Sequence, residues 1–371
     1  MRILHTESSC GWGGQELRIL DESQGLIGRG HSVAIAAPPR SRVLSEARQR
    51  GIGTVALPIA RKNLAGLASL YRWLKSNPVE VVNTHSSTDS WLTALACTML
   101  KNPPPIVRTR HISAPVPGNL ATRWLYRTAT MHVVTTGESL RRQLIEGNGM
   151  MPDHVTSVPT GIDVQRFVPG DRHAAREALG LLRDGFLIGV VATLRSWKGH
   201  RFLFEAFAEI PGKDSLLVVV GDGPQRASLE WLAAGLRIEE RVRFCGDQAD
   251  VLPWLQALDI FALPSYANEG LPQALVQAML CALPCVTTGV GSIGEAAVPD
   301  ETALLVPPQN AAALRSALVR LIGEPALRRE LGAAARKWCA ARFGFEPMLD
   351  SMERIFRSVA GRARPDMRKA A

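Results

Sequence analysis

The chain has 371 residues, more than one hydrophobic core usually supports, so we expect two domains. Its 46% hydrophobic and 21% charged residues exclude a disordered protein and fit a globular α/β protein. The six cysteines form no CxxC pair and no zinc spacing, which favours reduced thiols in a cytoplasmic protein. We expect no secretion signal, and the prolines within the uncharged stretch 270–294 argue against a transmembrane helix.

The positive charge is concentrated in the first half of the chain. Residues 1–165 hold 18 Lys and Arg against 11 Asp and Glu, whereas the remainder holds 25 against 23. A basic domain suits nucleic acid, an anionic membrane surface or a phosphorylated ligand. Because no zinc-finger or aromatic RNA-binding motif accompanies the charge, we expect no nucleic-acid partner.

Strand-like and helical segments alternate along the first half. We expect strands at 1–7, 31–37, 55–58, 79–84, 105–109, 131–135 and 155–159, and helices at 16–28, 63–75 and 91–100. This alternation predicts a parallel, doubly wound sheet. The turn-rich segment 160–169 then predicts the domain boundary, with a first domain at 1–168.

The same alternation restarts after residue 185. It predicts strands at 186–192, 215–220, 242–245, 259–264 and 285–288, with helices at 198–209, 226–234, 251–257 and from Pro272 to before Pro284. The fold class is therefore α/β, with two doubly wound Rossmann-like domains that face each other across a cleft. The second domain spans 169–344, and an amphipathic helix at 345–359 precedes a basic tail at 362–371.

Glu269 follows the predicted strand 259–264, at the sheet edge where open α/β sheets bind ligands. A helix-capping carboxylate is an equally good interpretation of this residue alone. Arg195 and Lys198 stand at the junction of another strand and helix, where the helix dipole disfavours positive charge. A bound polyphosphate explains these two cations, and a solvated basic turn is the alternative.

Two histidines of the first half also follow predicted strands. His85 and His111 are candidates for a ligand site, although a structural histidine is a competing interpretation for both. Arg108 and Arg110 flank His111 and suit either a phosphate or a solvated loop. The glycine-rich loop CGWGGQ at 10–15 can bring main-chain amides close to a phosphate, but it lacks the third glycine of the dinucleotide fingerprint.

Several motifs stand in a particular order along the chain: GWGGQE at 11–16, VPTGIDVQRFVP at 158–169, VATLRSWKG at 191–199, VVVGDGP at 218–224, SYANEGLPQALVQAM at 265–279 and ETALLVPP at 301–308. Their order and spacing resemble those of the retaining nucleotide-sugar glycosyltransferases with the GT-B fold, the family 4 group. The resemblance covers nearly the whole chain and implies a fold whose terminal helix crosses back to the first domain.

The resemblance also implies roles for individual residues. Lys198 would neutralise the leaving diphosphate, with Arg195 beside it, and Glu269 would hold hydroxyls of the donor sugar. The remaining implied donor contacts are the amides of Gly270 and Leu271, the loop glycines Gly13 and Gly14, and His111 at the sugar or reacting centre. The family needs neither metal nor cofactor, and this sequence has no Asp-x-Asp pair.

This chain departs from the family pattern at two positions. Gln277 replaces the second glutamate of the signature, and Thr193 stands where many relatives have an arginine. An amide can still bond a ribose hydroxyl, but it brings no charge. We therefore expect transfer from a nucleotide sugar to a glycan or lipid-linked acceptor, as in assembly of lipopolysaccharide or other envelope polysaccharide.

Two further functions and one further partner remain open from the sequence. A sugar-nucleotide-binding protein with weakened catalysis is the alternative function, and a sugar-nucleotide isomerase is a more distant one. The arginines of the first domain suit an acceptor phosphate or the inner face of the cytoplasmic membrane, and equally an ordinary solvated surface. They include Arg40, Arg42, Arg48, Arg50, Arg61, Arg108, Arg110, Arg123 and Arg127.

Overall fold

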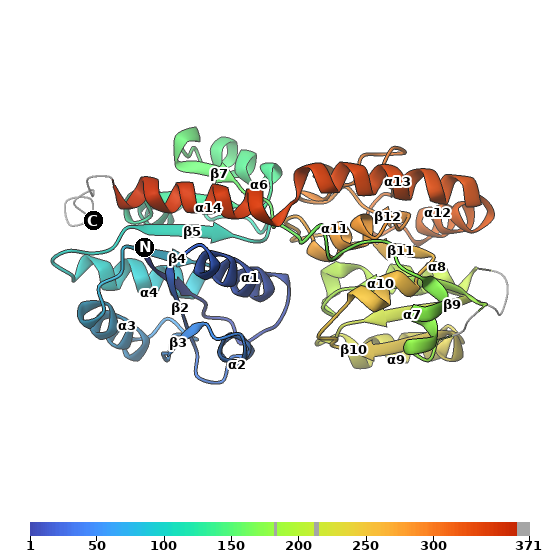
Figure 1. Ribbon diagram of the computed structural model, residues 1–371, viewed down its shortest axis with the longest axis horizontal. Helices are drawn as coiled ribbons and strands as arrows, with labels where there is room; N and C mark the ends of the chain where they lie inside the picture. Colours follow the sequence, from blue (N-terminus) through green and yellow to red (C-terminus); the bar gives the residue numbers. More distant parts are fainter. Residues whose placement is uncertain (182–183, 211–214, 362–371) are drawn as a thin grey trace. The chain divides into compact units, whose positions relative to one another are not determined.

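The computed structural model describes residues 1–181, 184–210 and 215–361. It divides the chain into two compact units (Figure 1). Unit 1 contains Met1–Thr160 and the segment from Glu346 onward, and unit 2 contains Gly161–Phe345. The basic tail predicted at 362–371 lies outside the described residues. No helix within the described ranges is long and apolar enough to cross a bilayer.

Unit 1 is built on a seven-stranded parallel sheet in the order β3-β2-β1-β4-β5-β6-β7. The strands are β1 Arg2–Thr6, β2 Ser32–Ala37, β3 Gly53–Ala56, β4 Val81–Thr84, β5 Ile106–Arg110, β6 His132–Thr135 and β7 Val155–Ser157. The strand order reverses between β1 and β4. In an open α/β sheet such a reversal opens a crevice beyond the carboxyl ends of the two strands.

The helices of unit 1 follow its strands along the chain. They are α1 Gly14–Gly28, α2 Arg42–Gln49, α3 Leu64–Ser76, α4 Ser87–Thr98, α5 Leu120–Trp124, α6 Glu138–Arg142 and the terminal α14 Phe345–Ala360. β4 and β6 are buried along their whole length, as expected for strands covered on both faces. The alternation of strand and helix predicted from the sequence is confirmed.

Unit 2 repeats this architecture with a six-stranded parallel sheet in the order β10-β9-β8-β11-β12-β13. Its strands are β8 Phe186–Val191, β9 Ser215–Val220, β10 Val242–Gly246, β11 Ile260–Leu263, β12 Cys285–Thr287 and β13 Leu304–Leu305. Its helices are α7 Arg172–Ala178, α8 His200–Ala208, α9 Arg226–Gly235, α10 Leu252–Ala257, α11 Gln273–Leu280, α12 Ala311–Gly323 and α13 Pro325–Arg342. Here the strand order reverses at β8, so β8 and β11 flank the switch point.

The terminal helix α14 belongs to unit 1 although it follows unit 2 in the sequence (Figure 1). It buries Met348, Leu349, Met352, Ile355, Phe356 and Val359. Arg29, the residue directly after α1, pairs with Glu346, Asp350 and Glu353 of α14. The predicted α/β class, with its two doubly wound sheets and returning helix, is confirmed.

The boundary between the units falls after Thr160 rather than after residue 168. The segment beyond Thr160 joins unit 2 because Ile162 bridges to Gly344 and its amide donates to the carbonyl of Phe343 at 2.8 Å. Ile162 and Phe167 also pack in the core of unit 2. The turn residues of this segment were visible in the sequence, but these packing partners were not.

Candidate active site

Lys198 and Glu269 meet at the carboxyl edge of the unit 2 sheet. Lys198 lies in a short 3-10 turn beyond β8, and Glu269 lies in the loop beyond β11, the neighbouring strand. The ammonium Nζ of Lys198 donates to Oε1 of Glu269 at 2.6 Å. Their side chains are 19% and 5% exposed, so each charge is paired where little water can reach it. The structure therefore unites a cation and a carboxylate that stand 71 residues apart in the sequence.

Two glycines allow the loops around this pair to touch through their main chains. Gly199 has φ +75° and directly follows Lys198, and a Cβ there would lie 2.0 Å from the carbonyl oxygen of Pro264. Gly291 has φ +61°, and a Cβ there would lie 2.1 Å from the carbonyl oxygen of Glu269. No side chain fits at either contact, and L residues rarely adopt these dihedrals. The glycines thus allow the Lys198 turn to pack against Pro264, and the loop at Gly291 to pack against Glu269.

The other residues of unit 2 that were predicted to bind the sugar donor lie around the same edge. Arg195 is exposed at the start of the Lys198 turn, with its guanidinium 5.6 Å from the ring centre of Trp197. Gly270 and Leu271 follow Glu269 and are buried. Within the described chain, their amide groups make no hydrogen bond to another residue. An anion could therefore accept from these amides at the entry to α11.

Gln277 lies on the partly exposed side of α11, whereas Leu275, Val276, Ala278 and Met279 are buried. The Gln277 side chain is thus only partly covered by the core. Thr193 is also partly exposed, and it stands in the loop between β8 and the Lys198 turn.

Sequence reasoning missed His200, which begins α8 directly after Gly199. It is 2% exposed, and both ring nitrogens are buried without a partner in the described structure. Burial first, and then the charge of Lys198, lowers its pKa to about 3. His200 is therefore a neutral ring beneath the Lys198 turn. The only signal in the sequence was its position beside Lys198.

At the corresponding edge of unit 1, three histidines form a hydrogen-bonded chain. Nδ1 of His5 lies 2.9 Å from Nε2 of His85, and Nδ1 of His85 lies 2.9 Å from Nε2 of His111. Each ring comes from one of three adjacent strands or the residue after it, β1, β4 and β5. The structure thus brings the predicted His85 and His111 together and adds His5, which the sequence concealed inside an apolar strand.

Burial keeps this histidine chain neutral. It lowers the pKa of His5 to about 3, with a smaller effect from the charge of Arg18. It also lowers the pKa of His85 and of His111 well below the ordinary value, with further lowering by Arg18 in both cases. His5 is fully buried, His85 is 4% exposed and His111 is half-buried, so the chain runs from the core towards the surface.

Three buried carboxyl groups lie near the glycine-rich loop of unit 1. Glu7 accepts hydrogen bonds from the Ser9 amide and the Ser86 hydroxyl, each at 2.6 Å, and from the side chain of Gln15. Burial raises its pKa, and burial together with Glu7 raises the pKa of Glu16 to about 7. Asp89 is the third buried acid, and burial raises its pKa as well.

The predicted loop glycines Gly13 and Gly14 lie at the start of α1, and Gln15 separates them from Glu16. Gly13 has φ 175°, an extended conformation that any residue adopts. Gly14 is exposed and begins the helix. The glycine-rich loop therefore leads into a helix whose first turn carries a buried acid, a feature that the sequence analysis did not predict.

The predicted arginine surface of unit 1 needs correction. Arg108 is 5% exposed, with its guanidinium 4.4 Å from the Tyr126 ring centre, so it does not lie on the surface. It points into the unit because β5 is a central strand of the sheet. Arg110 is held by the Tyr126 hydroxyl at 2.7 Å and by the carbonyls of Ile112 and Ala114.

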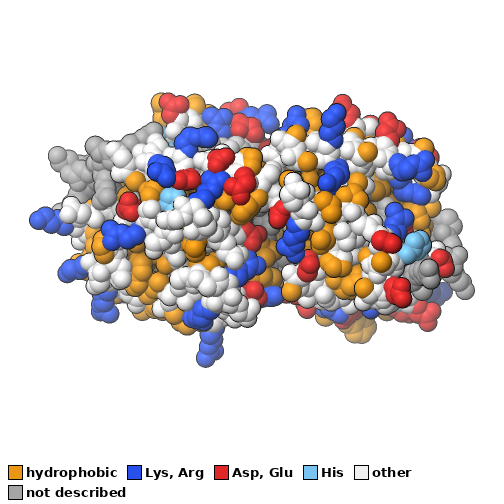
Figure 2. Space-filling view, in the orientation of Figure 1, with side chains coloured by type: hydrophobic (Ala, Val, Ile, Leu, Met, Phe, Trp, Pro, Cys, Tyr) orange, Lys and Arg blue, Asp and Glu red, His pale blue; other side chains and the backbone are white. Residues whose placement is uncertain are grey.

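Arg123 and Arg127 are exposed and line a pocket of about 260 Å³ with Tyr126 and Met150. Basic and acidic side chains are interspersed on the face that Figure 2 shows. The positive balance of the first half is therefore not gathered into one region on this face. Arg127 also donates through Nη2 to the carbonyls of Asn148 and Gly149, and the two arginines at the pocket remain the candidates for an anionic acceptor.

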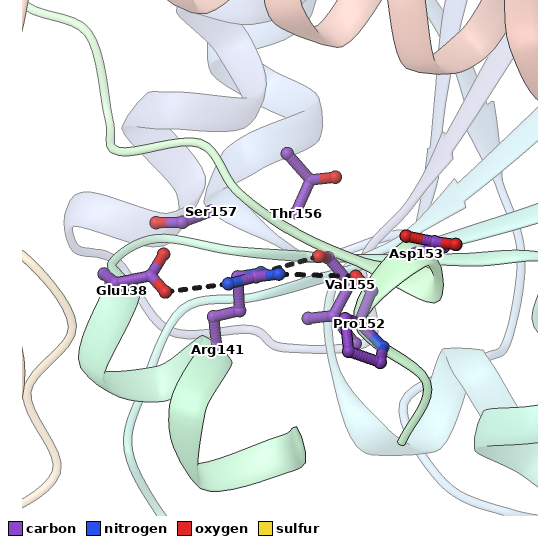
Figure 3. A pocket seen from close by; sticks show the side chains of 7 residues that line it. All are labelled: Glu138, Arg141, Pro152, Asp153, Val155, Thr156 and Ser157. Atoms are coloured by element: carbon purple, nitrogen blue, oxygen red, sulfur yellow. Dashed lines mark hydrogen bonds and ion pairs between the residues drawn. The ribbon is translucent and has the colours of Figure 1, made fainter.

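A larger hollow, of about 600 Å³, lies beside the edge strand β7 (Figure 3). Arg141 crosses it, with its guanidinium bonded to Glu138 at 2.9 Å and to the carbonyls of Val155 and Pro152 at 2.8 and 3.4 Å. These contacts engage each of the three guanidinium nitrogens of Arg141, the only cation among the seven lining residues. Arg141 therefore joins α6 to the segment at Pro152 and Val155, an arrangement that suits a structural contact rather than an anion site.

Both halves of the chain match family models. Residues 12–166 match the model for Glycosyltransferase Family 4, and residues 185–324 match the model for Glycosyl transferases group 1. The structure is similar to HepE of Anabaena in complex with UDP-glucose, with a TM-score of 0.86, 21% identity, and coverage of 96% of this chain and all of HepE. The chain belongs to the GT-B glycosyltransferases of family 4.

Curated relatives of this GT-B family protein include two with different names. It is 31% identical over 230 residues to the D-inositol 3-phosphate glycosyltransferase of Saccharomonospora viridis, covering 58% of this chain and 53% of that protein. It is 27% identical over 348 residues to the 2-deoxystreptamine glucosyltransferase of Streptomyces kanamyceticus, covering 84% and 89% respectively. The chain thus spans about half the length of the inositol phosphate relatives that it matches.

Gly291→Ala tests how the Lys198–Glu269 site of this GT-B protein is built. A Cβ close to the Glu269 carbonyl, on a left-handed backbone, should lower the free energy of unfolding by at least about 2 kcal/mol. Urea unfolding measures this effect. The matched control is Gly294→Ala, because no heavy atom lies within 4 Å of a Cβ there. Equal behaviour of the two variants would contradict the account.

Glu16→Gln tests the buried acid beside the glycine-rich loop. The pKa of Glu16 rises from 4.5 to about 7 on folding, so the unfolded state loses this proton first as pH rises. Below about pH 4.5 the protonated Glu16 thus adds about 3 kcal/mol to the free energy of unfolding, compared with its ionised form. This contribution is lost as the pH rises to about 7. The variant should match the natural protein near pH 4.5 and exceed its stability at pH 8. Urea unfolding across this range measures the difference, and parallel pH profiles would refute the assignment.

Proposed function

We propose that this protein transfers a sugar from a nucleoside diphosphate donor to a hydroxyl group of an acceptor, with retention of configuration and without a metal ion. The Lys198–Glu269 pair carries the proposal. It lies at the switch point of the unit 2 sheet, within the residues that match the group 1 model. The amides of Gly270 and Leu271 and the exposed Arg195 add anion-binding groups at the same edge.

Donor binding would proceed by an exchange of partners. In the free protein Lys198 pairs with Glu269 at 2.6 Å, so both must be given new partners when a ligand enters. The diphosphate takes the ammonium group of Lys198, and hydroxyls of the sugar donate to the Glu269 carboxylate. A nucleotide sugar supplies both partners, whereas a free nucleotide supplies only the first. This explains in physical terms why the site would prefer the intact donor.

The chemical step breaks the bond between the anomeric carbon and the diphosphate oxygen and forms a bond from that carbon to the acceptor oxygen. The acceptor's proton leaves with the nucleoside diphosphate. Negative charge develops on the diphosphate as the bond breaks, and Lys198 would stabilise it by an amount that can reach several kcal/mol. Because the leaving phosphate oxygen serves as base, attack occurs on the face that it vacates, which retains the configuration.

The comparisons support a choice of first substrates. HepE was solved with UDP and with UDP-glucose, so UDP-hexoses are the first donors to test. The relatives named after D-inositol 3-phosphate and 2-deoxystreptamine support small ring acceptors. Transfer to a glycan or lipid-linked acceptor of the cell envelope is the narrower proposal from the sequence. A panel of both acceptor classes separates these possibilities.

Reduced catalysis is the second candidate, because Gln277 replaces a charged residue of the signature and is partly exposed. A protein of this kind would bind UDP-sugars without turnover over the whole acceptor panel. The two candidates are thus distinguished by one pair of measurements, calorimetric binding and release of UDP.

Lys198→Ala and Glu269→Ala test the proposed roles. Loss of Lys198 should lower kcat/KM for transfer at least about 100-fold, since the leaving group loses its counter-charge. Loss of Glu269 should weaken binding of the UDP-sugar but strengthen binding of UDP, because Lys198 is then unpaired. The matched control is Arg201→Ala, a cation three residues from Lys198 whose side chain is 73% exposed. Transfer unchanged in both variants would show that the roles are wrong.

We also propose that the protein is cytoplasmic and attaches to the inner face of the membrane through unit 1. Arg123 and Arg127 are exposed beside Leu120, which is 81% exposed, and such a mixture of basic and apolar groups suits an anionic lipid surface. Sedimentation with anionic vesicles should occur at low salt, decrease at high salt, and weaken in the double variant with both arginines changed to Ala. Sedimentation that is absent at low salt would refute the attachment.

A further inference from the structure

The hydrogen bonds between the three histidines of unit 1 restrict which ring nitrogen of each can carry the proton. A neutral imidazole has one N–H donor and one acceptor nitrogen. The contacts from His5 to His85 and from His85 to His111 are each 2.9 Å, and each needs one hydrogen between two ring nitrogens. Only two arrangements of three neutral rings satisfy both contacts: all three protons on Nδ1, or all three on Nε2.

The two arrangements differ at the ends of the chain. With the protons on Nδ1, His111 presents an N–H at its outer nitrogen and His5 keeps a lone pair at Nε2. With the protons on Nε2, His111 presents a lone pair and His5 carries an N–H at Nε2. That nitrogen of His5 is buried and has no partner in the described structure. Since buried donors without an acceptor are rarer than unused acceptors, the first arrangement is favoured.

The surrounding groups favour the same arrangement. Arg18 is the charge that acts on His5, and a nearby cation favours a lone pair over an N–H. Phe356 meets His5 edge to face at 6.3 Å and offers no hydrogen-bond acceptor oxygen or nitrogen. The charge of Arg110 favours the opposite arrangement, with a lone pair rather than an N–H at the outer nitrogen of His111. Its guanidinium is, however, bonded to Tyr126 and to the carbonyls of Ile112 and Ala114, in a more exposed place.

We infer that His5 and His85 are positioning residues that fix His111 as a hydrogen-bond donor through its Nδ1–H. The outer nitrogen of His111 bonds to no described residue, and the ring is half-buried, so it is the end of the chain that a ligand can meet. Such an N–H donates to an oxygen, and it cannot accept a proton unless all three rings change tautomer together. His111 thus holds a substrate oxygen and does not serve as the general base.

This inference rests on the proposed function only where it identifies the oxygen held by His111 as an oxygen of the sugar or of the acceptor. The arrangement of the protons is a property of the free protein. It can therefore be tested without a substrate, and the two proposals can fail separately.

Nitrogen-15 NMR of the whole chain, labelled in its eight histidines, tests the inference directly. At pH 7 the shifts of His5, His85 and His111 should show neutral rings with the proton on Nδ1. A proton on Nε2 in any of the three, or a charged ring, overturns the inference. The signals are assigned by single histidine substitutions, and this measurement on the natural sequence decides the matter even if a variant fails to fold.

His5→Phe tests the coupling along the chain. The new ring keeps the stacking but removes both nitrogens, so the shifts of His111 should change although His111 does not touch His5. If the transfer activity is present, kcat should fall about tenfold while the donor KM changes less than about twofold. The matched control is His132→Phe, which removes a buried histidine of the same sheet that bonds to Thr156 instead. Unchanged His111 shifts in His5→Phe, or equal changes in the control, would refute the coupling.

Discussion

The ion pair between Lys198 and Glu269 depends on strand order. Parallel strands place their carboxyl ends at one edge, and the reversal at β8 makes β8 and β11 neighbours. Two charges so little exposed are tolerated only because each is paired with the other, since an unpaired charge at such a site is strongly destabilising. A ligand that separates them must replace both partners. In the free protein, the two groups that a nucleotide sugar would engage are thus paired with each other.

Much of this arrangement could be predicted from the sequence. Strands covered on both faces appear as apolar runs, which is why the positions of β8 and β11 and the loops after them were correct. The pairing of Lys198 with Glu269 could not be predicted, because it requires knowing that strands so far apart in sequence are neighbours in the sheet. Helix α2 was missed because its buried face consists only of Val43, Leu44 and Ala47 within a polar segment.

The errors in unit 1 have a common physical origin. Arg108 was interpreted as surface charge because its neighbours in sequence include Arg110, but alternation along a central strand buries it against Tyr126. His5 was overlooked for the complementary reason, since a polar residue within a short apolar strand has no distinguishing pattern. Net charge describes a segment as a whole. It does not say which of its side chains reach the solvent. In unit 1, the burial of individual side chains decides which residues belong to the candidate site.

The two sheet edges consequently offer different chemistry. The edge of unit 2 carries a fixed cation and a fixed anion, which suit a charged diphosphate and its sugar. The edge of unit 1 carries imidazoles that burial keeps neutral, and carboxyl groups such as Glu16 whose raised pKa of about 7 leaves them partly protonated near neutral pH. Neutral donors and acceptors bind hydroxyl groups without having to be desolvated as charges. An edge of this kind suits the hydroxyl groups of a ligand, whereas the paired charges at the edge of unit 2 suit a diphosphate.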